Sequence, residues 1–132
     1  MNPGTQAEAD FIVLPSDTAK ALPLSPDDDF PEVFATSRMI ALMELAASRC
    51  MRPLLQDGQL SVGVGVDIRH LGATPVGVRV SARATFLGQE GKLYLFKVEA
   101  FDEGGLIGEG LHSRAIVATD RLLAGAHSRN QR

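Results

Sequence analysis

The sequence predicts an α+β fold in which one helix packs against an antiparallel β-sheet. One apolar segment, from about Thr36 to Arg52, is long enough to form a helix. Four later segments favour extended chain, and the first two alternate apolar residues with small or polar ones at the period of two that strands show. Tight turns containing glycine separate the last of these segments. One helix followed by strands joined through tight turns is typical of α+β proteins with an antiparallel sheet.

The helix has clear predicted ends. Thr36 or Ser37 is expected to begin it, because either hydroxyl can cap the first free amide groups. Pro53 cannot continue a helix and disfavours helical geometry just before it, so the end is expected near Arg52. The segment is apolar on almost every side, which is expected of a helix enclosed by a sheet rather than laid across a surface.

The chain before the helix is expected to be largely irregular. Residues 11–14 favour a short strand ended by Pro15, and residues 16–22, "SDTAKAL", are interpreted as a second short strand. The following residues, "PLSPDDDFPEVF", are rich in proline and aspartate and favour a loop.

The strands after the helix supply the other half of the expected core. They are expected at residues 60–68, 77–87, 92–102 and 106–117, with turns at 88–91 and 102–105. Their alternation gives each strand one apolar face, made of Val62, Val64, Val66 and Ile68 in the first and of Val78, Val80, Ala82, Ala84 and Phe86 in the second. Residues 127–132 are expected to form a frayed tail. One helix wrapped by a curved antiparallel sheet is the hotdog arrangement, which this pattern favours.

Composition limits the classes of function. The 132 residues suit a single domain, 1–132. A net charge of −3 argues against a nucleic-acid-binding protein, which normally has a basic face. No secretory signal is visible, and no apolar stretch is long enough to span a membrane. The single cysteine, Cys50, fits a reducing compartment, so the expected location is the cytoplasm.

Glu44 is the unexpected residue of the apolar helix. At helical spacing it shares a face with small residues only, Ser37, Ala41 and Ser48. A carboxylate there would lose hydration, which disfavours its charged form unless a cation or hydrogen-bond donors compensate. One interpretation is structural: Glu44 turns outward or pairs with an arginine such as Arg49 or Arg114. The other is that Glu44 belongs to a functional site.

Two further residues allow the same pair of interpretations. His70 stands where a predicted strand meets a loop, a common place for functional side chains, although a lone histidine there is more often solvated. Thr36 is most simply a helix cap. His112 and His127 carry less signal, and no His/Cys cluster has the spacing of a metal site, so no metal is expected.

Three segments resemble those of a known family. "FPEVFATSRMIALMELAASRCM", "HLGATPVG" and "GEGLHSRAIV" are similar to segments of the fluoroacetyl-CoA thioesterases, within the hotdog superfamily. The resemblance implies a catalytic threonine, glutamate and histidine, which fall on Thr36, Glu44 and His70. It also implies a substrate contact at Phe30 and, as weaker assignments, contacts at Gly63 and Arg114. No cofactor is implied, because CoA is part of the substrate.

The family is dimeric, with sites at the subunit interface, so a homodimer is also implied. Family members specific for fluoroacetyl-CoA carry two phenylalanines as an apolar lid before the threonine. Phe30 matches one of them, whereas the other position falls at about Asp27. A short-chain acyl-CoA is therefore favoured over fluoroacetyl-CoA itself as the substrate.

This trio of residues suits thioester hydrolysis. Such a reaction needs an attacking group, a proton carrier and donors for the developing oxyanion. The hypothesis is that Thr36 and Glu44 attack directly or activate water, while His70 transfers protons and polarises the carbonyl. Two alternatives remain from the sequence: a non-catalytic acyl-CoA binding module and a hotdog enoyl-thioester dehydratase.

Overall fold

The computed structural model describes residues 1–131 and contains five strands and two α-helices in this part of the chain. The strands are β1 (Gln6–Ile12), β2 (Gln59–His70), β3 (Arg79–Glu90), β4 (Leu93–Asp102) and β5 (Gly105–Ala118). The α-helices are α1 (Thr36–Met51) and α2 (Thr119–Arg129). Three short 3-10 helices, η1 (Pro15–Asp17), η2 (Ala19–Ala21) and η3 (Arg52–Leu54), lie in the connections.

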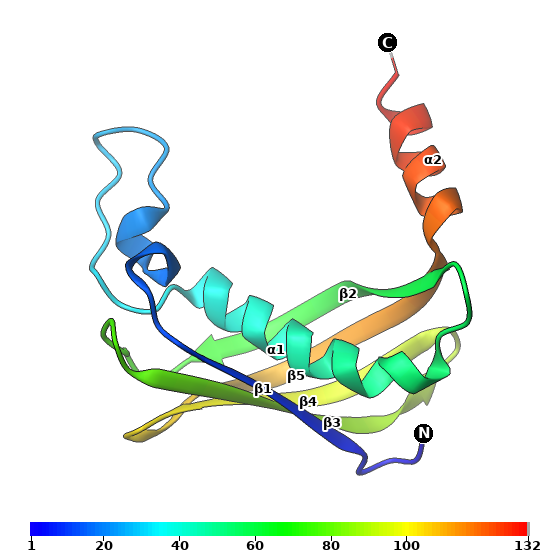
Figure 1. The fold of residues 1–132 in the computed structure, drawn as a ribbon, viewed down its shortest axis with the longest axis horizontal. Helices are drawn as coiled ribbons and strands as arrows, with labels where there is room; N and C mark the ends of the chain where they lie inside the picture. Colours follow the sequence, from blue (N-terminus) through cyan, green and yellow to red (C-terminus); the bar gives the residue numbers. More distant parts are fainter. Residues whose placement is uncertain (132) are drawn as a thin grey trace.

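The five strands form one antiparallel sheet in the order β1-β3-β4-β5-β2. Helix α1 crosses one face of this curved sheet, and α2 projects away from it (Figure 1). Strands β3, β4 and β5 follow each other through two tight turns, as the alternating pattern predicts. The predicted α+β arrangement of a central helix on an antiparallel sheet is confirmed.

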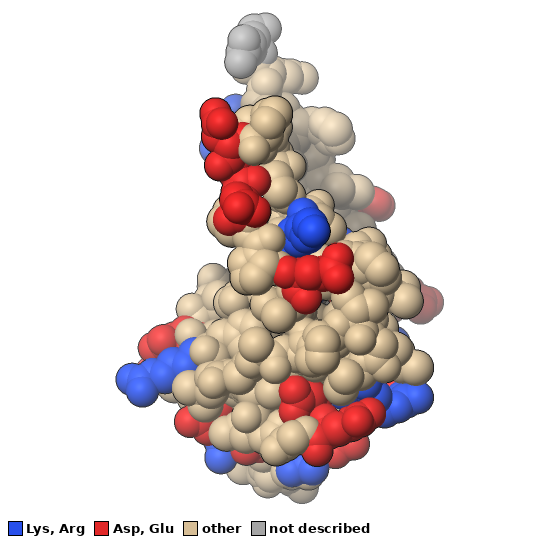
Figure 2. All heavy atoms as spheres, turned by 90° about the vertical axis from the view of Figure 1, so that its left-hand side faces the viewer, with Lys and Arg blue, Asp and Glu red and all other residues tan. Residues whose placement is uncertain are grey.

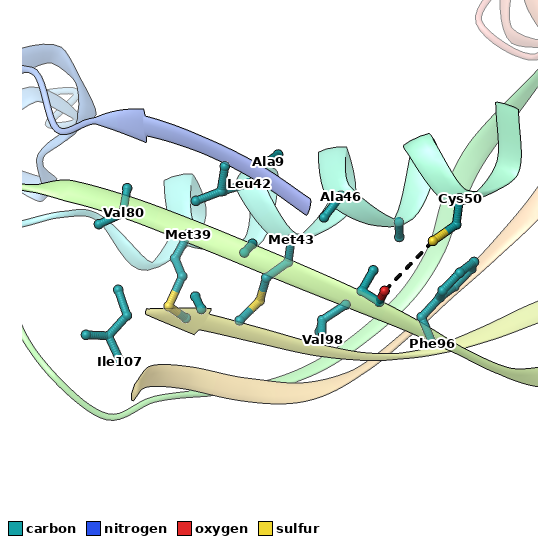
Figure 3. Packing of buried hydrophobic residues seen from close by; sticks show 14 of the residues in the cluster. Ala9, Met39, Leu42, Met43, Ala46, Cys50, Val80, Phe96, Val98 and Ile107 are labelled. Atoms are coloured by element: carbon teal, nitrogen blue, oxygen red, sulfur yellow. Dashed lines mark hydrogen bonds between the residues drawn. The ribbon is translucent and has the colours of Figure 1, made fainter. Parts of the chain in front are cut away.

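The core lies between the inner side of α1 and the middle of the sheet. Met39, Met43 and Met51 of α1 are fully buried, and β3 contributes the small residues Ala82 and Ala84 beneath them. Figure 3 shows Met39 and Met43 of α1 directed at the strands. Burial of each large side chain contributes roughly 1.5–3 kcal/mol relative to exposure. This packing fixes where every side chain along α1 points.

The curved sheet wraps around one side of α1 and leaves the opposite side of the helix open in the single chain. Ala41, Leu45 and Arg49 remain exposed, with Leu45 at 43%, because the sheet covers only one side of the helix. The helix ends at Met51, one residue before the predicted end, and Pro53 is accommodated in the 3-10 turn η3.

The N-terminal segment also differs from the prediction. Strand β1 spans Gln6–Ile12 and pairs with β3, so it begins earlier than expected. Residues 16–22 form 3-10 turns instead of a second strand. A physical reason is local: the Asp17 carboxylate accepts a hydrogen bond from the Leu14 amide at 2.9 Å, which closes a turn at this point.

Two predictions for the later strands are also corrected. In β2, Val64 and Val66 are 55% and 49% exposed, because this edge strand is irregular between Gly63 and Gly65 and only one neighbour covers it. The expected frayed tail is helical as far as Arg129 in α2, although none of the side chains of α2 is buried. Over residues 1–131, no helix is long and apolar enough to cross a lipid bilayer.

Candidate active site

Thr36 and His70 form a hydrogen-bonded pair. Thr36 is the first residue of α1, and His70 is the last residue of β2. Thr36 Oγ1 lies 2.7 Å from His70 Nδ1. The N-cap residue is Ala35, and no side chain caps the helix, so the interpretation of Thr36 as a helix cap is wrong. The hydroxyl is directed to the imidazole instead.

The other nitrogen of this imidazole is free. His70 Nε2 is buried and has no hydrogen-bond partner in the described chain. The ring borders a hollow of about 360 Å³ whose wall includes Thr36, Pro31 and Phe34. Burial lowers the pKa of His70 below its ordinary value, and the neighbouring Gly72 backbone opposes this effect. The ring is therefore neutral near pH 7 and can accept a proton.

The loop after His70 holds this pair in place. The Leu71 amide donates to the Ile107 carbonyl at 2.6 Å, and the Phe34 amide donates to the Thr74 carbonyl at 2.8 Å. The buried Thr74 hydroxyl donates to the Asp102 carboxylate at 2.7 Å. These bonds tie the chain before Thr36 and the chain after His70 to the β4–β5 turn.

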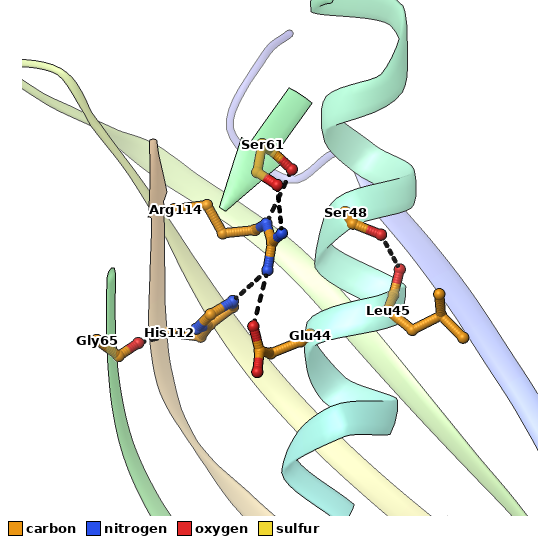
Figure 4. A network of polar contacts seen from close by, with 7 residues as sticks. All are labelled: Glu44, Leu45, Ser48, Ser61, Gly65, His112 and Arg114. Carbon is orange, nitrogen blue, oxygen red and sulfur yellow. Dashed lines mark hydrogen bonds and ion pairs between the residues drawn. The ribbon is translucent and has the colours of Figure 1, made fainter. Parts of the chain in front are cut away.

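Glu44 belongs to a second polar group, on the sheet side of α1. Its Oε2 accepts a hydrogen bond from Arg114 Nη1 at 3.2 Å (Figure 4). The Arg114 side chain is 7% exposed and that of Glu44 is 40% exposed. Ser61 accepts two further bonds from Arg114, through its hydroxyl from Nε and through its carbonyl from Nη2, both at 3.0 Å. Of the two arginine partners considered in the sequence, Arg114 is the one that pairs with Glu44.

Gly63 lies directly beside this ion pair. It faces Arg114 across the β2–β5 ladder. A Cβ atom at Gly63 would stand 2.5 Å from Glu44 Oε2, closer than side chains approach one another. The carboxylate therefore occupies the space that any other residue at position 63 would fill. Three sequence-predicted residues, Glu44, Gly63 and Arg114, come together here.

The two polar groups are separate within one chain. Glu44 follows Thr36 by eight residues on the same helix, which corresponds to roughly 12 Å along the helix axis. Glu44 bonds to Arg114, and Thr36 bonds to His70, with no hydrogen bond between the two groups among the described residues.

Phe30 lies in the irregular segment between η2 and α1, where it is 47% exposed. The exposed residues 27–29 of the same segment are all aspartate. Figure 2 shows carboxylates gathered over the protruding part of the molecule that this segment forms. Asp28 accepts hydrogen bonds from the Leu24 and Ser25 amides, at 2.9 and 3.1 Å, and so closes the loop on itself.

Two members of the Glu44 group escaped prediction. His112 is buried and bonds through Nε2 to Arg114 Nη1 at 3.1 Å and through Nδ1 to the Gly65 carbonyl at 2.8 Å. Ser61 anchors the guanidinium. The sequence does contain an indication for His112: it lies two residues before Arg114 in a predicted strand, so the two side chains share one face of that strand. No similar signal marks Ser61. Cys50, as expected, is buried in the core.

Comparison with known proteins decides the family. A model of the fluoroacetyl-CoA-specific thioesterase family matches residues 13–120. The chain belongs to this family. One relative, the fluoroacetyl-CoA thioesterase of Streptantibioticus cattleyicolor, is 39% identical to this chain over 126 residues, covering 94% of this chain and 91% of that protein.

Solved structures agree with this membership. A fluoroacetyl-CoA thioesterase superposes with a TM-score of 0.93 at 37% identity, covering 99% of this chain and 98% of that chain. A variant of this enzyme in complex with acetyl-CoA superposes with a TM-score of 0.93 at 35% identity, covering 99% of this chain and 100% of that chain. A thioesterase superfamily member from Thermus thermophilus superposes with a TM-score of 0.85 at 31% identity, covering 96% of this chain and 91% of that chain. The predicted resemblance, the hotdog fold and the thioesterase class are thereby confirmed.

Proposed function

We propose that this protein hydrolyses the thioester bond of a short-chain acyl-CoA and releases the free acid and CoA. Its membership of a thioesterase family and its similarity to a structure that binds acetyl-CoA support this function. The observation that carries it is the Thr36–His70 pair at the start of α1, whose imidazole keeps one buried nitrogen free.

The geometry suggests a role for each of these groups. His70 Nδ1 accepts the proton of the group that attacks the thioester carbon, which is either the Thr36 hydroxyl or a water beside it. The first amides of α1 and the positive end of its dipole favour the negative charge that develops on the carbonyl oxygen. When the carbon–sulfur bond breaks, the protonated imidazole gives the proton to the leaving thiolate. Attack by water yields the free acid at once. Attack by Thr36 leaves an acyl ester on its oxygen, and a water deprotonated by His70 then hydrolyses this ester to the free acid and restores the hydroxyl. No cofactor takes part in this scheme.

Glu44 is the third proposed catalytic group. It pairs with Arg114, and a glutamate carboxylate can act as a base or as a nucleophile. Because roughly 12 Å of helix separates it from Thr36 in one chain, we place Glu44 in a site that a second copy of the chain completes. Exposed valines on the β2 edge and the uncovered side of α1 support such a homodimer.

The lid segment supports a short-chain acyl group in general rather than fluoroacetyl alone. Phe30 is present, but Asp27 occupies the position of the second apolar lid residue, and a carboxylate excludes water poorly. Phe30, Gly63 and Arg114 are the proposed substrate-binding residues. We propose the cytoplasm as the location, which the single, unpaired Cys50 supports.

Replacement of Glu44 by Gln tests the proposal. The variant should fold normally and lose thiol release from acetyl-CoA by roughly 10²–10⁴-fold, because the amide can neither accept a proton nor attack. Glu90→Gln, an exposed residue at the end of β3, is the matched control and should keep full activity.

A panel of acetyl-, fluoroacetyl-, longer acyl- and enoyl-CoA substrates separates the rival functions. Free thiol indicates the thioesterase, and loss of enoyl absorbance indicates a dehydratase. Thermal stabilisation by the acyl-CoA without any product would show a binding module and contradict the proposal. Unchanged thiol release by Glu44→Gln would remove Glu44 from the mechanism.

A further inference from the structure

His112 is a buried histidine that the proposed mechanism does not use. It lies on β5, is 3% exposed, and both ring nitrogens are engaged. Nδ1 lies 2.8 Å from the Gly65 carbonyl oxygen, which can only accept, so Nδ1 carries the proton. Nε2 lies 3.1 Å from Arg114 Nη1, which can only donate, so Nε2 is the acceptor. These partners select one neutral tautomer.

The neutral ring completes the surroundings of Arg114. Nε and Nη2 of the guanidinium donate to Ser61, and Nη1 donates to both Glu44 Oε2 and His112 Nε2. Figure 4 shows the imidazole and the carboxylate on the same edge of the guanidinium. Each Nη1 hydrogen therefore has its own acceptor. Without the imidazole acceptor, one of these buried hydrogens would be unpaired, and a buried unpaired donor is costly.

The same arrangement disfavours protonation of His112. A proton on Nε2 would face the N–H groups of Arg114 directly. The charged groups around the ring are Arg114 on its own strand and Glu44 on α1. Burial is the main cause that lowers the pKa of His112; the Gly65 hydrogen bond opposes it, Arg114 lowers the pKa further, and Glu44 raises it.

We infer that His112 is a positioning residue for the thioesterase reaction: its neutral imidazole fixes Arg114 in the orientation that holds the Glu44 carboxylate over Gly63. The inference rests on the proposed catalytic role of Glu44. It assigns His112 no contact with the substrate, since its two nitrogens are already bonded within the protein.

Two substitutions separate the two hydrogen bonds of the ring. The amide of His112→Asn can replace the Nδ1 donor to Gly65 but is too short to reach Arg114. The longer side chain of His112→Gln brings a carbonyl oxygen close to the position of Nε2, where it can accept from Arg114. His112→Asn should lower kcat/KM for acetyl-CoA by roughly 10-fold to 100-fold. His112→Gln should recover most of this loss.

The full-length variants are compared by thiol release, with folding checked by circular dichroism and thermal unfolding. His127→Gln, an exposed histidine on α2, is the matched control and should behave like wild type. If His112→Asn does not fold, His112→Phe, which keeps the ring shape but has no acceptor, takes its place. Wild-type activity in a folded Asn or Phe variant, or equal losses in the Asn and Gln variants, would overturn the inference.

Glu44→Gln in the same assay keeps the two proposals apart. If Glu44→Gln is fully active, the proposed function of Glu44 has failed. If Glu44→Gln is inactive while His112→Asn is as active as wild type, only the positioning role of His112 has failed.

Discussion

The Glu44 carboxylate can take its position only because residue 63 is a glycine without a side chain. The Glu44 carboxylate fills the space where a Cβ at position 63 would lie, 2.5 Å from Oε2 and 3.3 Å from His112 Cε1. Only glycine lets the carboxylate reach Arg114 across the backbone of β2. The role that the family resemblance suggests for Gly63 thus has a steric reason at this site, independent of any contact with substrate.

Gly63→Ala should therefore impair catalysis more than folding. The added methyl group must push the Glu44 carboxylate away from Arg114 Nη1. Displacement of a catalytic group by about 1 Å can lower the rate roughly 10²-fold. Steady-state thiol release measures the loss. Gly125→Ala on α2, where a Cβ meets nothing within 4 Å, is the control and should leave kcat/KM unchanged. Full activity of Gly63→Ala would contradict the close approach.

His112 should also make the stability of the protein depend on pH. Its pKa is lowered in the folded protein, mainly by burial, from an ordinary value of 6.5. Above that value the ring is neutral in both states and its hydrogen bonds contribute in full. As the pH falls below it, the unfolded chain binds a proton that the folded protein resists, so stability decreases.

The measurement is the thermal midpoint of wild type and His112→Gln between about pH 7.5 and pH 5, a range that brackets the ordinary histidine pKa. Wild type should lose more than the variant, because the variant has no proton to gain at this position. Other groups titrate in both proteins and cancel in the difference. Parallel curves for the two proteins would show that His112 does not resist protonation.

At the level of elements, the sequence predicted the parts whose pattern reflects burial. The α1 segment is strongly apolar and the β3 segment alternates apolar and polar residues, and the structure buries the apolar face of each. The pattern of β2 was equally clear, yet two of its valines are exposed. Alternation records which side chains share a face, and an edge strand can leave that face uncovered by its own chain.

The elements that the sequence did not predict are formed by local hydrogen bonds or bury few side chains. The turns at 15–21 arise from hydrogen bonds such as that between Asp17 and the Leu14 amide, which no periodicity reports. Helix α2 buries no side chain, so its sequence lacks a continuous apolar stripe. A helix of 11 residues is marginal on its own in water. Short polar segments of this kind are easily interpreted as a tail.

The candidate site could also be predicted only in part. The residue types of Thr36, Glu44 and His70 could be assigned from the family resemblance, but their partners could not. Thr36 pairs with a residue 34 positions away, and Glu44 with one 70 positions away. Such contacts depend on the strand register of the folded sheet. His112 was passed over because it lies within a strand pattern, although its spacing of two residues from Arg114 places both on one face of the strand.

At the scale of the whole molecule, one chain holds two incomplete halves of the proposed site. Thr36 and His70 lie at the N-terminal end of α1, and Glu44 with Arg114 lies near its middle. The exposed side of α1 and the exposed edge of β2 are the surfaces on which a second copy would pack. A two-fold axis between such copies would place one half from each chain at two equivalent sites.

Mixing two inactive variants tests this arrangement. Thr36→Ala and Glu44→Gln should each be inactive alone. In a mixed dimer, one site combines Thr36 and His70 of one chain with Glu44 of the other and is intact, whereas the second site carries both changes. Random reassociation from denaturant in equal amounts makes about half of the dimers mixed, so about a quarter of wild-type thiol release should return. Refolding each variant by itself is the control. No recovery from a mixture shown to contain mixed dimers would mean that each chain carries its own complete site.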